Sequence, residues 1–592
     1  MQLLTLLTTS VADVSDIALS KLALYAGIEG EIVPVTSNAF PDGAAVLETV
    51  AQSDALVLSL GTIEALTKLG LTSAAIGRQL GSSAKSVLVV GRPASTVQAN
   101  LVHELSDGAV TIIGETTDHA KAYTFDLKTL WPDSPLHAQS FTVPAQVALE
   151  PTPLIASSHR ATKLMTSDEG TVFVSCKVGL SRLFFLFADS IPDIDTVLPP
   201  SVSPRCFYPT VLPILLFLRF AFREQCWTNP FPSGSVIIDD PLLHHQYGFV
   251  HFESLLKEAR NNHYAITLAF IPFNYNRSDQ TVARLLAGHP NEFSLCVHGC
   301  DHTGAEFAQD DQAFLFYQAR QALRRVKQHE QITGLSFDSV MVFPKGKFCT
   351  SAVKALKMSH YTAAANSTLY PSDWEAEGPT IKDLLSLACT RYHGFPIFQR
   401  RYPVDVFDFA VDLFLGRPAI IVAHHQYFRK GCKALTDFVH SINSVCPAIQ
   451  WMPLGRAVSS AAWYRKVGSQ QYEASFCTPN FLVRNPSSFC SEFTLCYTDT
   501  AHELIENATV EGRDIRQADG QLFAKVILEP GQRSHLQILY KNTPDHPYHH
   551  RLTFRLGARC RRYLSEFRDN YLSKCVPVLA AVEAVRRSLL KG

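Results

Sequence analysis

The sequence predicts a multidomain α/β protein built around a central (β/α) barrel. The chain has 592 residues, more than one hydrophobic core usually organises. Short apolar runs alternate with helix-like stretches over residues 1 to 115, and again over residues 232 to 455. From residue 456 the pattern changes to short strands separated by turns, which is typical of a small β-sandwich.

The composition excludes several other classes of protein. Hydrophobic residues make up 46% of the chain and charged residues 18%, as in a folded globular protein. The 53 basic side chains are balanced by 54 acidic ones. The chain therefore lacks the excess of positive charge that would indicate a nucleic-acid partner. The 14 cysteines include no CxxC pair, which indicates reduced thiols rather than a disulfide framework.

Neither a secretion signal nor a membrane span is expected. The first residues, MQLLTLLTTSVADVSD, lack a basic start and a long apolar stretch, so we expect a cytoplasmic protein. The most apolar run, VLPILLFLRFAF at 211 to 222, contains Pro213 and Arg219 and is shorter than the roughly 20 residues that cross a bilayer. We interpret this run as a buried helix.

Residues 1 to 200 are expected to form an N-terminal α/β domain. Apolar runs beginning near residues 3, 31, 55, 86 and 109 are spaced for a parallel layer. The segment TVFVSCKVGLSRLFFLFAD at 171 then indicates two strands joined at a glycine. The pattern loosely resembles a flavodoxin-like or glutamine-amidotransferase-like domain, but it contains neither GxGxxG nor GxSxG. We therefore expect a structural or recognition domain.

The barrel is predicted over residues 232 to 455 by seven apolar segments separated by helical stretches. In such a barrel the chemistry lies where strands end and loops begin. Asp239 and Asp240 close the first predicted strand, His298 the third and His424 the seventh. The seven segments are SVIID at 235, AITLAFI at 265, FSLCVH at 293, SVMVF at 339, YTAAA at 361, GFPIF at 394 and AIIVA at 419.

Two further parts follow the barrel. Residues 456 to 550 contain strand-like segments such as QLFAKVILEPGQRSHLQILY and are expected to form a small β-sandwich. Residues 551 to 592 include the Arg-rich amphipathic segment RLTFRLGARCRRYLSEFRDNYLS, which is predicted to be helical. This helix could dock on an anionic surface or a partner, or its polar side could face solvent.

The segment HGCDH predicts part of a metal site. Two imidazoles four residues apart, those of His298 and His302, can converge on one ion, and Asp240 can add a carboxylate. The histidine pair alone is weak evidence, but IIDDP and IIVAHH at two other strand ends make packing a poor explanation. We expect a divalent metal, with Zn²⁺ as the first choice and Co²⁺, Ni²⁺ or Mn²⁺ as alternatives.

The adjacent carboxylates of Asp239 and Asp240 indicate the same site. Each disfavours ionisation of the other unless a cation compensates, and a metal would supply that cation. If Asp240 binds the metal, Asp239 is free to take a proton from the attacking water, whose pKa a bound metal lowers to about 7. A helix N-cap or a turn explains one of the two aspartates but not readily both.

IIDDP, HGCDH, FPKG and IIVAHH, in this order, resemble the motifs of the polysaccharide deacetylase family, which includes chitin, chitooligosaccharide and peptidoglycan deacetylases. The resemblance covers about 220 residues and implies a distorted (β/α)7 barrel. It also implies that Asp239 is the catalytic base, that Asp240, His298 and His302 bind the metal, and that His424 is the acid.

The resemblance has departures. Ile237 and Ile238 replace the usual Thr-Phe before the aspartates, and Gly299 replaces the usual Ser or Thr after the first histidine. The arginine that orients the catalytic aspartate has no clear counterpart in VFPKGKF. There Lys345 is a candidate substitute, although it offers a point charge instead of a planar fork.

The acid has a rival next to it. Neighbouring residues on a strand face opposite ways, so only one of His424 and His425 should face the mouth of the barrel. We favour His424 because it ends the apolar run IIVA.

Three residues are expected to contact the substrate: Lys345, Tyr275 in FIPFNYNRSD, and Trp374 in PSDW. Aromatic groups such as Tyr275 suit sugar hydroxyls, although a plain structural loop explains this tract as well. Trp374 stands in for the tryptophan wall that the resemblance implies. Arg400 and Arg401 in FQRRYP could contact an anionic substrate or merely pair with nearby acids.

The reaction implied is metal-assisted hydrolysis of an N- or O-linked acetyl group on a carbohydrate or glycoconjugate. One alternative is another hydrolase on the same barrel, such as a glycosidase that uses Asp239 with a distant carboxylate. A different class of alternative is a weak or inactive carbohydrate-binding or scaffold protein, for which the missing arginine is the best support. The oligomeric state stays open.

Overall fold

The structure of the chain is a computed structural model in which two compact units can be distinguished. The first unit comprises Met1–Thr228, Thr380–Leu385 and Tyr464–Tyr472, and the second comprises Asn229–Pro379, Ser386–Trp463 and Glu473–Gly592. The structure describes residues 4–8, 14–35, 52–68, 76, 85–119, 122–144, 151–188, 190–374, 378–498, 504–514, 517–518, 521–541 and 552–574.

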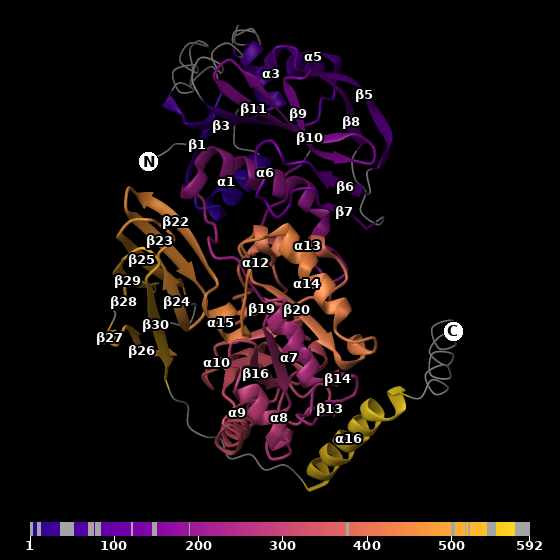
Figure 1. Cartoon of the computed structure of the whole chain (residues 1–592). Helices are drawn as coiled ribbons and strands as arrows, with labels where there is room; N and C mark the ends of the chain where they lie inside the picture. The colour runs from indigo at the N-terminus through magenta and orange to yellow at the C-terminus, as the bar shows by residue number, and fades with distance from the viewer. Residues whose placement is uncertain are drawn as a thin grey trace. The chain divides into compact units, whose positions relative to one another are not determined.

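The first unit is organised by a nine-stranded sheet in the order β2-β1-β3-β4-β11-β10-β9-β6-β7 (Figure 1). Neighbouring strands are parallel from β2 to β11 and antiparallel from β11 to β7. The strands are β1 (Leu4–Thr8), β2 (Gly30–Pro34), β3 (Ala55–Ser59), β4 (Ser86–Val90), β6 (Ala122–Phe125), β7 (Ser140–Thr142), β9 (Ala161–Ser167), β10 (Thr171–Val178) and β11 (Ser181–Leu186). The helices are α1 (Val14–Tyr25), α3 (Leu60–Lys68), α5 (Thr96–Leu105), α6 (Tyr208–Phe222) and the short α12 (Ile381–Leu385).

The parallel layer confirms four of the five predicted strands, which are β1 to β4. The prediction for the fifth run is wrong, because it lies in β5 (Val110–His119), which pairs antiparallel with β8 (Pro151–Ser157) outside this sheet. The position beside β4 is taken instead by β11, the second strand of the hairpin predicted at residue 171. Local apolar runs predict strands but not which long-range neighbour each strand will pair with.

The apolar run at 211 to 222 lies in α6, most of whose side chains are buried, as predicted. Across the described parts of the chain, every helix is too short or too polar to span a bilayer. The described cysteines are all free thiols.

Seven parallel strands form a barrel-like sheet in the second unit, in the order β19-β18-β17-β16-β15-β12-β20. Beyond the end of β19, Arg401 forms a parallel bridge with Ile421 of β20, so the sheet nearly closes on itself. All seven predicted strands are therefore confirmed. They are β12 (Ser233–Asp239), β15 (Ile266–Phe270), β16 (Phe293–His298), β17 (Phe337–Val342), β18 (Ala363–Asn366), β19 (Ile397–Gln399) and β20 (Ala419–His424).

The interior of this sheet is a packed core and not a channel. Each of the seven strands contributes a buried apolar side chain, for example Ile237, Cys296 and Phe398. Short α15 (Leu454–Ser459) adds Leu454 to the same cluster. Because both faces are covered, the strands appear in sequence as continuous apolar runs. The other helices of this part are α7 (Phe252–Asn261), α8 (Gln280–Ala287), α9 (Gln312–Thr333), α10 (Thr350–Lys357), α13 (Val406–Phe414) and α14 (Lys433–Val445).

The chain after the barrel forms two further sheets, in which the pairs β25–β29, β28–β29, β24–β30, β26–β30 and β26–β27 are antiparallel. Their strand orders are β22-β23-β25-β29-β28 and β24-β30-β26-β27. The phenol hydroxyls of Tyr497 and Tyr540 lie 2.7 Å apart and join β25 to β30, that is, one sheet to the other. The strands are β22 (Ala462–Gly468), β23 (Gln471–Phe476), β24 (Asn480–Arg484), β25 (Ser491–Thr498), β26 (Ile505–Val510), β27 (Arg513–Asp514), β28 (Gln517–Ala518), β29 (Gln521–Leu528) and β30 (Arg533–Tyr540).

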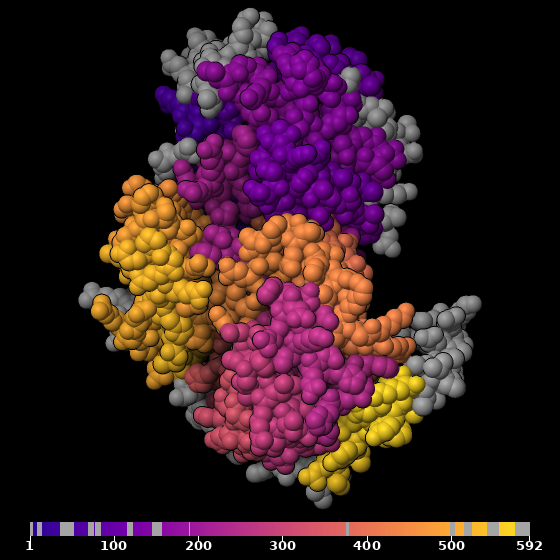
Figure 2. Space-filling view, viewed as in Figure 1, coloured from indigo at the N-terminus to yellow at the C-terminus, as the bar shows by residue number. Residues whose placement is uncertain are grey.

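The Arg-rich segment forms α16 (Leu552–Asn570), which confirms the predicted helix. Figure 2 shows it in yellow against the surface of the second unit, and it contacts the short hairpin of β13 (Gln246–Tyr247) and β14 (Val250–His251). The remainder of the predicted C-terminal segment, residues 575–592, lies outside the described residues.

Candidate metal centre and active site

The candidate site lies at the carboxyl ends of the barrel strands, where β12 ends at Asp239, β16 at His298 and β20 at His424. The backbone turns sharply directly after the first two of these strands. Asp240 has a φ of 72° and His302 a φ of 55°, a left-handed conformation that is uncommon for residues other than glycine. Such strained positions cluster at functional sites, where surrounding contacts hold them in place.

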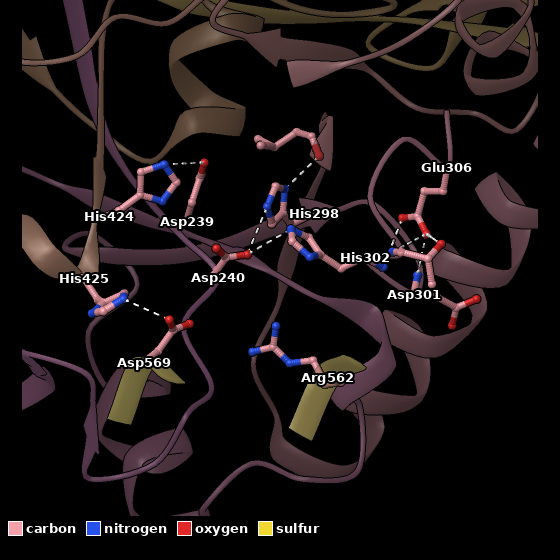
Figure 3. A network of polar contacts seen from close by, with 12 residues as sticks. Asp239, Asp240, His298, Asp301, His302, Glu306, His424, His425, Arg562 and Asp569 are labelled. Atoms are coloured by element: carbon pink, nitrogen blue, oxygen red, sulfur yellow. Dashed lines mark hydrogen bonds and ion pairs between the residues drawn. The ribbon is translucent and has the colours of Figure 1, made fainter. Parts of the chain in front are cut away.

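Three predicted ligands, Asp240, His298 and His302, come together in the structure. Oδ1 of Asp240 lies 3.2 Å from Nε2 of His298 and 3.2 Å from Nε2 of His302 (Figure 3). One ligand atom from each residue fits within a mutual separation of 4.8 Å. Ligands about 2.0–2.1 Å from a tetrahedral ion lie roughly 3.3 Å apart, so this spacing suits one metal ion.

The state of Asp240 Oδ1 supports a metal at this position. The atom is buried and makes no hydrogen bond to any described residue. A buried carboxylate oxygen without a donor is costly unless a cation compensates its charge. The donor set of two imidazoles and one carboxylate is one that zinc and similar divalent ions accept, with positions left open for water and substrate. The described residues therefore fit a bound divalent metal.

His298 is oriented by a hydrogen bond at its other ring nitrogen. Its Nδ1 lies 2.9 Å from the carbonyl oxygen of Val342, at the end of β17. Because a carbonyl can only accept, Nδ1 carries the proton and donates, which leaves Nε2 as the metal-binding atom. Backbone carbonyls commonly fix metal-binding histidines in this way.

The loop that presents His302 is held by the buried carboxylate of Glu306. Oε1 of Glu306 accepts hydrogen bonds from the backbone amides of Cys300 at 2.7 Å and His302 at 3.2 Å, and Oε2 accepts from Thr303 at 3.2 Å. This clamp therefore fixes the backbone of the HGCDH loop around His302. Sequence reasoning missed Glu306, because an acid four residues after a histidine carries no distinctive signal.

The neutral state of His302 suits a metal, and the two carboxylates of the site favour positive charge beside them. Burial lowers the pKa of His302 to about 4, so its imidazole is neutral at neutral pH, the form that binds metals. Burial would raise the pKa of Asp240, but the adjacent histidines hold it well below its usual range. For His298, burial would lower the pKa, but the charges of Asp240 and Asp239 raise it overall. The two carboxylates therefore attract positive charge to this point.

Asp239 points away from the three ligands and binds Arg400. Nη1 of Arg400 donates to Oδ1 of Asp239 over 2.6 Å, and both side chains are almost fully buried. Burial would raise the pKa of Asp239, but the charge of Arg400 lowers it below its usual value. Among the described residues it is thus Arg400, and not Lys345, that contacts Asp239. Lys345 is exposed and makes no hydrogen bond or ion pair to the described site residues.

His424 lies beside Asp239 in the paired register of β12 and β20. Its Nε2 is 4.0 Å from Oδ2 of Asp239, the oxygen that Arg400 does not bind, and 3.4 Å from the hydroxyl of Tyr402. The imidazole is partly exposed, with 42% of the side chain accessible, and can reach a substrate.

The neighbouring histidine, His425, faces a different group. Its ring is buried, stacks on Phe249 and places Nε2 3.5 Å from Oδ1 of Asp569 in α16 (Figure 3). The two histidines thus point in different directions, as alternation along the strand predicts.

The three predicted substrate contacts all follow barrel strands at the same end of the sheet. Tyr275 comes after β15, Lys345 after β17 and Trp374 after β18. Among the described residues, no hydrogen bond or ion pair connects their side chains to the metal ligands or to Asp239. Their roles stay predictions.

Of the other predicted alternatives, Arg400 and Arg401 both pair with acids. Nε of Arg401 lies 2.6 Å from Oδ2 of Asp412, and Nη1 of Arg417 lies 3.1 Å from the other oxygen of the same carboxylate. The tract FIPFNYNRSD contributes Arg277 to a different contact, two hydrogen bonds of 2.7 and 2.8 Å to Glu566 of α16. Nothing in the sequence showed that α16 would approach the site.

Comparisons with known proteins find similar folds only at low similarity. The chain matches no protein-family model and no curated protein sequence. Among solved structures it is similar to the carbohydrate deacetylase Agd3, with 8% identity, a TM-score of 0.45, and coverage of 91% of this chain and 99% of that chain.

Shorter matches are limited to part of the chain. A family 4 carbohydrate esterase from Streptomyces lividans has 14% identity and a TM-score of 0.24 over 37% of this chain and 91% of that chain. A family 4 pseudoenzyme from Bacillus anthracis, BA3943, has 12% identity and a TM-score of 0.24 over 37% of this chain and 63% of that chain. These similarities are too weak to decide the activity of the chain.

Proposed function

We propose that the protein is a metal-dependent deacetylase that hydrolyses an N- or O-linked acetyl group of a carbohydrate or glycoconjugate. The observation that carries the proposal is the pairing of the Asp240, His298 and His302 set with Asp239 and His424 at one end of the barrel. Zn²⁺ is our first choice of metal, and Co²⁺, Ni²⁺ and Mn²⁺ are alternatives.

A divalent ion bound to Asp240, His298 and His302 would polarise the acetyl carbonyl and acidify the attacking water. Asp239 is the general base: Arg400 holds its Oδ1, so Oδ2 is free to take a proton from that water. His424, beside that oxygen and partly exposed, is placed to protonate the departing amine or alcohol. Arg400 keeps Asp239 ionised and oriented between turnovers.

The inactive-scaffold alternative loses its main support. It rested on the absence of an arginine that orients the catalytic aspartate, and Arg400 occupies that position from the segment after β19. A glycosidase would need a second catalytic carboxylate about 5–10 Å from Asp239. Its neighbour in the sequence, Asp240, faces the two histidines instead.

Asp239→Asn tests the proposal through acetate release from acetylated oligosaccharides. Loss of a general base typically costs 10²- to 10⁴-fold in rate, so we expect acetate release to fall at least about 100-fold while the metal content is unchanged. Asp338→Asn is the matched control. Asp338, near the start of β17, is another barrel aspartate, but it is only partly buried and accepts hydrogen bonds from the Ser294 hydroxyl and the Gly455 amide. If both variants keep full activity, the proposed role of Asp239 is wrong.

A further inference from the structure

Helix α16 presents a charged face to the protein and an apolar face outward. Arg562, Glu566 and Asp569, spaced three and four residues apart, are buried, whereas Tyr563 and Phe567 are more than half exposed. Helices on protein surfaces usually have the opposite polarity. Burial of charged side chains is costly unless they are paired, so this face must be matched by partners on the barrel.

Those partners fix α16 beside the metal centre. Glu566 accepts two hydrogen bonds from Arg277 of the loop after β15, at 2.7 and 2.8 Å, and a third from Nε of Arg562 at 2.9 Å. Asp569 accepts a hydrogen bond of 2.8 Å from the Tyr247 hydroxyl, and its Oδ1 lies 3.5 Å from Nε2 of His425. The helix is therefore tied to three separate loops at the carboxyl ends of the strands.

Arg562 is the residue of α16 that faces the metal ligands. Its guanidinium group points toward Asp240 and His302 (Figure 3). Although burial would lower the pKa of Arg562, Tyr247, Asp240 and Glu566 raise it overall, so the side chain is cationic. Nη2 donates to the Tyr247 hydroxyl at 3.3 Å and Nε is used by Glu566, whereas Nη1 has no hydrogen-bond partner among the described residues.

The charges around α16 do not balance. Three carboxylates, Asp240, Glu566 and Asp569, face four arginines, so the contact region keeps an excess of one positive charge. A neutral sugar hydroxyl can accept an ordinary hydrogen bond from a guanidinium, whereas an oxyanion can accept two parallel, charge-assisted hydrogen bonds from it. The four arginines are Arg277, Arg561, Arg562 and Arg568.

We propose that Arg562 is a specificity-determining residue that binds a carboxylate or phosphate group carried by the acetylated sugar. This inference rests on the proposed deacetylase function and adds the class of substrate: an anionic, acetylated glycan. The guanidinium, held by Glu566 and Tyr247, is oriented before the substrate arrives, so little side-chain entropy is lost on binding.

Calorimetric titration of the full-length protein tests the inference without requiring turnover. The probes are an N-acetylglucosamine tetramer, its O-carboxymethylated form and its phosphorylated form. We expect wild-type protein to bind at least one anionic tetramer about tenfold or more tightly than the neutral one, because charge-assisted hydrogen bonds are roughly twice as strong as neutral ones. The carboxymethylated and phosphorylated probes distinguish the two oxyanions.

Arg562→Gln should abolish this preference, and Arg562→Lys should restore only part of it, because lysine keeps the charge without the fork. Glu566 remains paired with Arg277 in both variants, which favours a folded α16. Arg559→Gln is the matched control, since it removes a positive charge from the exposed side of the same helix. The inference is wrong if wild type shows no preference, or if Arg562→Gln retains it.

Acetate release from the same tetramers separates this inference from the proposed function. If wild type deacetylates neutral and anionic tetramers equally and Arg562→Gln slows both to the same degree, the deacetylase stands and the anion-binding role fails. If no tetramer is deacetylated but the anionic preference depends on Arg562, the binding role stands and the proposed reaction fails.

Discussion

Gly299 follows the first histidine ligand and has a φ of 62°, a conformation that L side chains rarely adopt. A Cβ at this position would lie 2.2 Å from Oε1 of Glu306 and 2.4 Å from Cγ of Pro344. The glycine therefore allows Glu306 to approach the backbone of the HGCDH loop and clamp it. The Ser or Thr expected from the family resemblance does not fit here.

Gly299→Ala should displace this clamp. We expect a large loss of thermal stability and weaker metal binding, because Glu306 or the loop must move to accept the methyl group. Gly334→Ala is the matched control: Gly334 has a similar φ of 75° but nothing within 4 Å of its Cβ position. It should cost only about 1–2 kcal/mol of stability and leave metal affinity unchanged. Equal effects on metal affinity in the two variants would contradict the clamp.

Single residues also show the limit of sequence reasoning. The metal ligands could be found because strand ends and the HxxxH spacing are local features. Arg400 could not be assigned, since it reaches Asp239 across 161 positions of sequence and its role depends on the nearly closed sheet. In the sequence, the segment FQRRYP shows two adjacent arginines and nothing that indicates which of them would contact Asp239.

Among the elements, α9 supports the barrel through a buried histidine. His329 of α9 is 1% exposed, packs with its ring 4.6 Å from that of Phe270 in β15, and places Nε2 2.8 Å from the Ser278 hydroxyl. Burial lowers the pKa of His329 to about 4, whereas an unfolded histidine has a pKa of about 6.5.

This difference predicts acid sensitivity. Between pH 6.5 and 4 the unfolded chain binds a proton at His329 and the folded chain does not, so stability falls as the pH falls through this window. From pH 7 to pH 5 the loss should be about 2 kcal/mol. Urea unfolding of wild type and His329→Gln at both pH values checks this, with exposed His263→Gln as control. The same pH dependence in all three proteins would refute it.

The helix α16 was predictable as a helix, but its contacts were not. Its Arg-rich amphipathic pattern indicated one polar face and one apolar face, and the natural expectation was a polar face in solvent. In the structure that face binds Arg277 and Tyr247 of the barrel loops. Pattern alone cannot distinguish solvated charges from charges buried in pairs.

At the scale of the whole molecule, the parallel strands were the most predictable part of the fold. All seven strands of the barrel and four in the first unit appear as continuous apolar runs, because both of their faces are covered. The antiparallel β5 was misplaced, since an isolated ribbon has the same apolar pattern as a strand of the layer. Apolar runs thus reveal strands, while the order of strands depends on contacts distant in sequence.

The metal content of the purified full-length protein tests the central claim most directly. Elemental mass spectrometry of wild type, His298→Ala and His302→Ala should show close to one divalent ion per chain in wild type and a loss in both variants. His263→Ala, an exposed histidine outside the site, should retain the ion. Wild-type protein that holds no metal, even after incubation with Zn²⁺ or Co²⁺, would contradict the account.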